Sequence, residues 1–216
     1  ALLRRLDHPN IMALYDATTR PTERGTEHLL LLEFCPGGTL ISHCIPLPSG
    51  ELPPPLTLKR IVAAFVDTCR GVGYLHSQSP PIQHRDLKLE NVLVDAQGRC
   101  KLCDFGSATT RVVDCATAER RERIDEEDRI ARFTTAMNRA PEMLDLYRGH
   151  RIDHAVDVWA LGCLLFTLAF QKHPFDTESP LQILNNRWAI PSTAPSYAPR
   201  LEPTLKMMPE PDPATR

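Results

Sequence analysis

The sequence lacks an excess of charge of either sign. Lysine and arginine together number 25 against 27 aspartates and glutamates, which gives a formal net charge of −2. Nucleic acid and anionic membranes attract proteins that carry a surplus of positive charge. The composition therefore gives no case for a nucleic-acid partner.

Long hydrophobic runs are also missing. The longest, VWALGCLLFTLAF at 158–170, is shorter than the roughly 20 apolar residues that cross a bilayer, and we predict a buried helix there. The opening residues ALLRRLDHPN are too polar for a signal peptide. No transmembrane segment and no internal repeat are expected.

The seven cysteines have no spacing typical of a metal site. The nearest pair, Cys100 and Cys103, alternates as in a strand. An odd, scattered set argues for reduced thiols and an intracellular protein. The 20 prolines cluster at 44–56 and 209–213, where we predict loops.

The remaining composition is that of a globular protein, with 42% hydrophobic and 24% charged residues. Leucines at helical spacing predict a helix at 2–6, and the apolar run 28–34 predicts a buried strand. Apolar periodicity over five turns predicts a long core helix at 56–77. The stretches 92–95 and 100–104 form a predicted hairpin.

The loop HRDLKLEN, between that helix and the hairpin, carries the chemistry of phosphoryl transfer. Such transfer needs a carboxylate to orient the attacking hydroxyl, cations near the phosphate and oxygen ligands for magnesium. Asp86 is placed as the catalytic base, and Lys88 is close enough to reach the phosphate. Asn91 offers an amide oxygen to the metal.

A second triplet follows the hairpin. Asp104, which opens DFG, supplies another oxygen ligand, and magnesium favours one or two protein oxygens completed by phosphate and water. Gly106 allows the backbone turn that lets Asp104 face the site. HRD or DFG alone is common by chance, but the two at this spacing, followed by APE at 140–142, form the protein-kinase signature set.

On these motifs the chain resembles a eukaryotic protein kinase. HRDLKLEN, LCDFGSATT, PEMLDLY, DVWALGCLLF and HPF are similar to the Numb-associated kinase family, which includes cyclin-G-associated and adaptor-associated kinases. The resemblance implies an α+β, bilobal protein-kinase-like fold. Residues 1–34 would be the last part of the N-lobe, with the end of helix C and strands 4 and 5, and 35–216 the C-lobe, truncated before the last helices.

The resemblance also implies an ATP site. Glu33 and Cys35 resemble the hinge residues whose backbone holds adenine, and Leu93 resembles the residue beneath the ring. Cys103 would face the nucleotide beside Asp104. It is either a reactive thiol or, as we favour, a small core residue.

Other residues resemble structural positions of kinases. His84 and Phe105 match the hydrophobic spine, and Asp157 matches the aspartate that anchors the catalytic loop. Glu142 and Arg216 match a buried ion pair.

Further residues bear on specificity and regulation. Thr135, together with Lys88, is typical of kinases that act on serine and threonine. Arg85 is either a sensor for an activation-segment phosphate or a structural tie. We expect the run 143–150 to order the segment by packing as an added helix, and 118–132 to be a solvated helical face.

Two departures stand out. Asn138 replaces a tyrosine, which bears on the substrate groove. The glycine-rich loop and the lysine that grips ATP phosphates are missing, and by register the helix C glutamate would precede Ala1. We therefore expect a fragment of a kinase domain, cut at both ends and inactive by itself.

The expected parent activity is that of a non-specific serine/threonine protein kinase that uses ATP and Mg²⁺. The resemblance implies protein substrates, including clathrin-adaptor proteins, and a cytoplasmic location, peripheral at endocytic or trans-Golgi membranes. The alternative is a pseudokinase or scaffold that binds protein partners. The intact Asp86, Lys88, Asn91 and Asp104 argue against that alternative.

Overall fold

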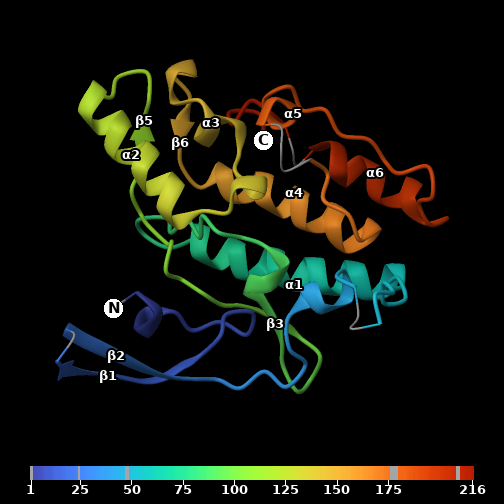
Figure 1. Cartoon of the computed structure of the whole chain (residues 1–216), viewed down its shortest axis with the longest axis horizontal. Coiled ribbons are helices and arrows are strands. Elements are labelled where there is room, and N and C mark those ends of the chain that lie inside the picture. Colours follow the sequence, from blue (N-terminus) through green and yellow to red (C-terminus); the bar gives the residue numbers. More distant parts are fainter. Residues whose placement is uncertain (1, 24, 47–48, 176–179, 208–209) are drawn as a thin grey trace.

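A computed structural model describes residues 2–23, 25–46, 49–175, 180–207 and 210–216. Three two-stranded antiparallel sheets and a set of helices form two unequal parts (Figure 1). The small part contains the β1–β2 ribbon, and the large part contains the helices. This arrangement confirms the predicted α+β, kinase-like fold. None of the described helices is long and apolar enough to cross a membrane.

The small part begins with a 3-10 turn, η1 (Leu3–Arg5), where the sequence predicts a short helix. The strands β1 (Leu14–Thr22) and β2 (Gly25–Leu32) then pair with each other. Two strands were expected within residues 1–34, but bounds were predicted only for the second of them. The prediction of a buried strand at 28–34 was wrong about burial, because Leu31 is 61% exposed. The two-stranded ribbon has no further described strand beside it.

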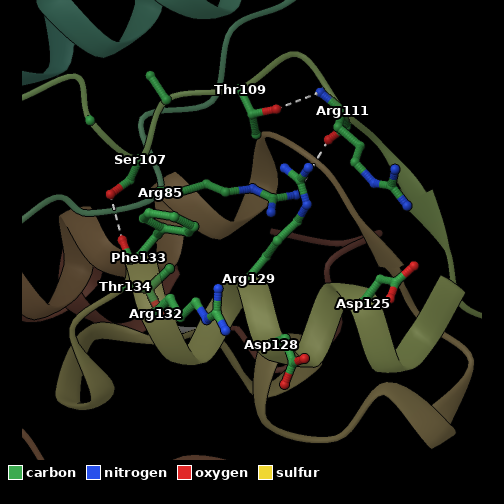
Figure 2. A pocket seen from close by; sticks show the side chains of 12 residues that line it. Arg85, Ser107, Thr109, Arg111, Asp125, Asp128, Arg129, Arg132, Phe133 and Thr134 are labelled. Atoms are coloured by element: carbon green, nitrogen blue, oxygen red, sulfur yellow. Dashed lines mark hydrogen bonds between the residues drawn. The ribbon is translucent and has the colours of Figure 1, made fainter. Parts of the chain in front are cut away.

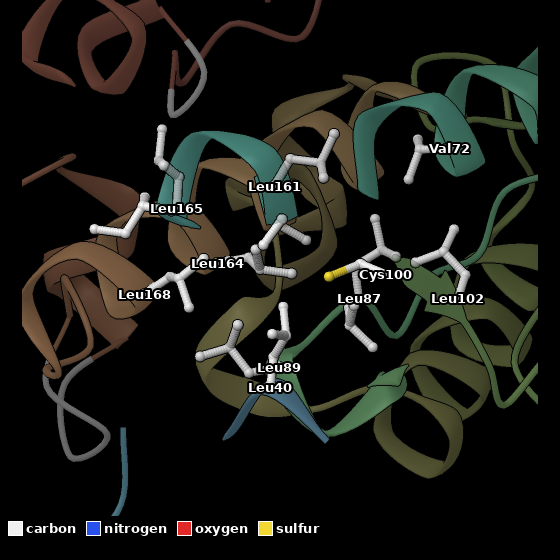
Figure 3. Close-up of a cluster of buried hydrophobic side chains, with 14 of the residues drawn as sticks. Leu40, Val72, Leu87, Leu89, Cys100, Leu102, Leu161, Leu164, Leu165 and Leu168 are labelled. Carbon is white, nitrogen blue, oxygen red and sulfur yellow. The ribbon is translucent and has the colours of Figure 1, made fainter. Parts of the chain in front are cut away.

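Two helices form the centre of the large part. They are α1 (Leu58–His76) and α4 (Ala155–Phe170), both close to their predicted bounds. Thr57 caps α1 by accepting a hydrogen bond from the amide of Arg60. Most of α4 is buried, as its apolar run predicts. Figure 3 shows leucines of α4 in one cluster with Val72 of α1 and with Leu87 and Leu89 of the catalytic loop.

The predicted hairpin is present as β3 (Val92–Val94) and β4 (Cys100–Leu102). It lies against α1 at Gly71, where an added Cβ would come within 2.9 Å of the Leu102 side chain and 2.8 Å of the Asn10 carbonyl oxygen. Asn10 in turn donates to the Cys100 carbonyl at 2.8 Å. These close contacts fix the hairpin, and with it the loops before and after it.

The segment between DFG and APE contains a helix, α2 (Arg120–Phe133). It is preceded by β5 (Val113–Asp114), which pairs with β6 (Arg151–Ile152). The predicted solvated face is largely correct, but Glu126 and Ile130 are buried. α2 therefore docks on the large part by one side.

The predicted added helix at 143–150 is wrong as a continuous element. The chain forms α3 (Pro141–Leu144) and the 3-10 turn η5 (Leu146–Arg148), interrupted at Asp145, whose φ and ψ are −143° and 89°. Met143 and Leu146 are nevertheless buried, so the predicted packing is present.

The chain ends with α5 (Pro180–Leu184) and α6 (Ala198–Met207). The described residues of the proline-rich stretches 44–56 and 209–213 form neither helix nor strand, as the sequence predicts. Residues 47–48 and 209 lie outside the described residues.

Candidate active site

The Asp86 carboxylate is held by three side chains. The Thr135 hydroxyl donates to Oδ1 at 2.6 Å, and Nζ of Lys88 lies 2.9 Å from Oδ2. Asn91 donates from Nδ2 to Oδ2 at 3.0 Å and to the Asp86 carbonyl at 2.8 Å. Lys88 also donates to the Thr135 hydroxyl at 2.9 Å, which closes the ring of contacts. The structure thus brings together four residues that the sequence placed in the catalytic machinery.

These contacts keep Asp86 ionised. Burial disfavours the charged carboxylate, but hydrogen bonds from Thr135 and Lys88 favour it and hold its pKa below the usual range. An ionised carboxylate next to an ammonium group can orient and accept the proton of an attacking hydroxyl.

Asp157, at the start of α4, fixes the backbone of the catalytic loop. Its carboxylate accepts the amide of His84 at 2.8 Å and the amide of Arg85 at 2.8 Å. Arg85 has a φ of 65°, a conformation that costs free energy in a residue with a side chain. The Asp157 carboxylate is fully buried, and although burial opposes its charge, the His76 imidazole at 2.9 Å helps to keep its pKa low. Asp157 therefore holds the strained turn that presents Asp86.

Asp104 lies just beyond β4 and is exposed to solvent. The left-handed turn falls at Asp104 itself, with φ 56°, and not at Gly106 as the sequence suggested. Gly106 lies close to this carboxylate, because an added Cβ would be 3.2 Å from Oδ1 of Asp104. His84 supports this turn, with its ring 5.2 Å from that of Phe105 and its Nε2 3.1 Å from the Cys103 carbonyl.

The catalytic loop, with Asn91, and the turn at DFG, with Asp104, offer oxygen ligands that suit a magnesium ion. Asn91 uses its Nδ2 on Asp86, so its Oδ1 remains for a cation, and Asp104 offers an exposed carboxylate. The amide of Cys103 donates to the Asn91 carbonyl at 3.0 Å, which places the two loops side by side. The described residues contain no cluster of three or more His, Cys, Asp or Glu for a metal. Magnesium, which keeps phosphate and water ligands, does not require one.

The expected hinge residues, Glu33 and Cys35, follow the end of β2. The Glu33 side chain pairs with Lys101 of β4 at 2.9 Å, in a site where the Lys101 side chain is 7% exposed. Within the described part of the chain, the Glu33 carbonyl and the Cys35 amide make no backbone hydrogen bond. Leu93 lies in β3 and bridges to Thr39. The backbone groups expected to meet adenine are thus left for a ligand.

Cys103 is not a reactive thiol in this structure. Its side chain is buried, and burial raises the pKa to about 11. The thiol is therefore protonated near neutral pH, and Cys103 acts as a small core residue.

Glu142 and Arg216 form a bidentate ion pair at 2.7 and 3.1 Å, with both side chains sealed from solvent. The Arg216 guanidinium also lies over the Trp159 ring, 5.2 Å from its centroid. Arg216 also donates from Nη1 to the carbonyl of Ala155, the first residue of α4, at 3.0 Å, so the pair links the APE motif to α4.

Three functional side chains were missed by the sequence reasoning. Glu126 contacts Arg85 and so links α2 to the catalytic loop. Lys101 anchors the hinge, and His173 lies 2.9 Å from Asn138, the residue that replaces the usual tyrosine. Only Lys101 gave a signal in the sequence, because it is a charged residue between apolar neighbours in the predicted strand 100–104. The other two contacts join residues far apart in sequence, and no local pattern indicates them.

Comparison with known proteins agrees with this geometry. A family model described as "Protein kinase domain" matches residues 1–208. A probable serine/threonine-protein kinase of Dictyostelium discoideum is 46% identical over 213 residues, covering 97% of this chain and 26% of the relative. Another from the same organism is 41% identical over 219 residues, covering 100% of this chain and 19% of the relative.

A protein kinase domain-containing protein of Schizosaccharomyces pombe is 37% identical over 183 residues, covering 85% of this chain and 27% of the relative. The chain thus spans 19% to 27% of the length of these curated relatives.

Proposed function

The chain belongs to the protein kinase domain family, and from that premise we propose that its parent protein transfers the ATP γ-phosphate to serine or threonine of protein substrates. The observation that carries the proposal is the closed ring of contacts among Asp86, Lys88 and Thr135. A pseudokinase has no need of an ionised base held beside a lysine. The ring therefore favours the enzyme over the scaffold alternative.

Each residue has a role in the proposed reaction. ATP would supply the phosphoryl group as substrate, and Asn91 and Asp104 would hold a magnesium ion whose charge would offset that of the phosphates. The Asp86 carboxylate orients the substrate hydroxyl and accepts its proton. Lys88 places a positive charge near the group in transit, and Thr135 holds both side chains in position.

The 216 residues contain neither a glycine-rich phosphate loop nor the strand lysine that grips ATP phosphates. We propose that these features come from other parts of the parent protein, so that the isolated chain transfers no phosphate. Robust phosphorylation of a generic serine/threonine peptide by the purified chain would contradict this part of the proposal.

The motif resemblance supports a finer assignment. We propose a member of the Numb-associated type that acts in the cytoplasm and at endocytic or trans-Golgi membranes, with clathrin-adaptor proteins among its substrates. The support is the set of motifs named above, HRDLKLEN, LCDFGSATT, PEMLDLY, DVWALGCLLF and HPF. Peptides from clathrin adaptors should then be better substrates than scrambled peptides of the same composition.

The test of the main proposal uses the full-length protein with Mg-ATP and a mixed library of peptides. Mass spectrometry of the products should find phosphoserine and phosphothreonine. Predominant phosphotyrosine, or no transfer to any peptide, would overturn the assignment.

A further inference from the structure

Arg85 and Glu126 form a buried ion pair. Nη1 of Arg85 contacts Oε1 of Glu126, and the two side chains are 5% and 0% exposed. Arg85 belongs to the catalytic loop and precedes the base, whereas Glu126 belongs to α2. The pair therefore fastens the helix of the activation segment directly to the loop that presents Asp86.

The Arg85 guanidinium also donates two hydrogen bonds to acceptors outside α2. Nε donates to Oε1 of Gln83 at 2.8 Å, and Nη2 donates to the Arg111 carbonyl at 3.3 Å. Both of these acceptors are neutral. A buried cation without an anion is costly, so the site requires one negative group, and Glu126 supplies it.

A second guanidinium also contacts Glu126. Nε of Arg111 lies 3.4 Å from Oε2 of Glu126. The charged residues that line an adjoining cavity of about 580 Å³ are four arginines and two aspartates, namely Arg85, Arg111, Arg129, Arg132, Asp125 and Asp128. Figure 2 shows that Arg129 points from α2 towards Arg85. The Glu126 carboxylate thus lies against two guanidinium groups, an arrangement that would also suit a phosphate.

α2 connects this pair to the reacting groups. Ile130, one turn after Glu126, is buried in the second apolar cluster. Phe133 ends the helix, and its carbonyl accepts the Ser107 hydroxyl next to DFG. Two residues later, Thr135 donates to Asp86. The position of α2 thus determines whether Thr135 reaches the base.

We propose that Glu126 is a positioning residue for phosphoryl transfer. Its carboxylate stands on Arg85 where a phosphorylated residue of the activation segment would otherwise be needed. It thereby holds α2 and Thr135 in their working positions. This inference rests on the proposed function, because it assigns a role in that reaction.

The experiment compares Glu126→Gln with Glu127→Gln in the full-length protein. The two changes are chemically identical and adjacent in α2, but Glu127 is exposed. E126Q should lower kcat/KM for a peptide by about tenfold or more, the scale of one lost charge-assisted hydrogen bond. The KM for ATP should stay unchanged, since the hinge is not touched, and E127Q should match the wild type.

Hydrogen exchange supplies a readout that does not need phosphotransfer. In E126Q, amides of 107–135 should exchange faster, whereas those of α4 should not. Equal kinetics for E126Q and E127Q, or unchanged exchange in 107–135, would overturn the inference. If the wild type transfers no phosphate, the proposed function fails, and the exchange result still decides the role of Glu126 in holding the segment.

If E126Q does not fold, the double variant Arg85→Met with Glu126→Leu replaces it, because it leaves no unpaired charge in the core. A folded double variant with low turnover and rapid exchange in 107–135 would support the inference. A folded and fully active double variant would overturn it.

Discussion

The Thr135 hydroxyl donates to Oδ1 of Asp86 at 2.6 Å, although the two residues lie 49 positions apart in sequence. The Thr135 amide donates to the same oxygen at 3.1 Å. The end of the activation segment is therefore bonded to the catalytic base by both its backbone and its side chain. Any displacement of the segment disturbs the base itself.

Replacing Thr135 by valine should lower kcat by about tenfold or more, because the side chain keeps its shape but loses a hydrogen bond to a charged group. Thr135→Ser keeps the hydroxyl and should retain most of the activity. Thr117→Val, at an exposed site in the same segment, serves as the control. Steady-state kinetics of the full-length protein measure the effect, and equal kcat values for T135V and T117V would contradict it.

Substitutions of Asp86 and Asp104 should have different effects on catalysis and on nucleotide binding. Asp86→Asn should reduce the turnover number by about a hundredfold or more, the usual scale for a lost general base. Its affinity for ATP should hardly change, because the Asp86 carboxylate contacts the side chains of Lys88, Asn91 and Thr135 and would meet the substrate hydroxyl, not the nucleotide. Asp104→Asn should instead weaken nucleotide binding in the presence of Mg²⁺. Calorimetric titration with an ATP analogue separates the two, and a normal turnover number in D86N would refute the role of the base.

Much of this site was predictable because its signals are local. The catalytic loop and β3–β4 follow from contiguous motifs and alternation, and α1 and α4 follow from apolar periodicity. Glu126 was not predictable, because its partner Arg85 lies 41 positions away in sequence. Within its charged run, Glu126 has no feature that distinguishes it from Glu127.

Exposure of the apolar run 28–34 was missed for a related reason. A run of leucines predicts burial, but burial depends on what covers the strand, and Leu30 is 58% exposed. The helix expected at 143–150 was wrong in shape because Asp145 leaves the helical region and accepts the amide of Tyr147. Its apolar residues were correctly assigned to the core, since hydrophobicity is a property of the residue and not of the element.

The Glu142–Arg216 pair should matter chiefly for stability. Arg216→Met leaves a fully buried carboxylate without its partner, which costs roughly 3–5 kcal/mol in the free energy of unfolding. Adding Glu142→Leu should recover a large part of that loss, because the second charge is then removed as well. Arg120→Met, at an exposed position of α2, controls for the loss of an arginine. Urea denaturation measures these differences, and an R216M variant as stable as R120M would contradict the prediction.

Acid should weaken the fold through Asp86. Its pKa is held below the ordinary value of 3.8 by Thr135 and Lys88, against the opposing effect of burial. A carboxyl with a depressed folded-state pKa contributes stability that is present above its unfolded pKa and is lost as the pH falls through the folded pKa. The difference in unfolding free energy between wild type and D86N should be constant above about pH 5 and should shift against the wild type below about pH 4. A difference that stays constant down to about pH 3 would show that Asp86 gains nothing from these partners.

Removal of phosphate should leave the full-length protein largely active. The threonines that could accept a phosphate in the activation segment are Thr109, Thr110, Thr117 and Thr134. Arg85, which would receive such a phosphate, already contacts Glu126. Met143 and Leu146 add apolar packing that does not depend on charge. Protein treated with a phosphatase, and shown by mass spectrometry to carry no phosphate, should therefore keep most of its kcat. If activity instead collapses and returns when one of these threonines is phosphorylated, order in the segment comes from the added phosphate and not from the contacts that the chain already makes.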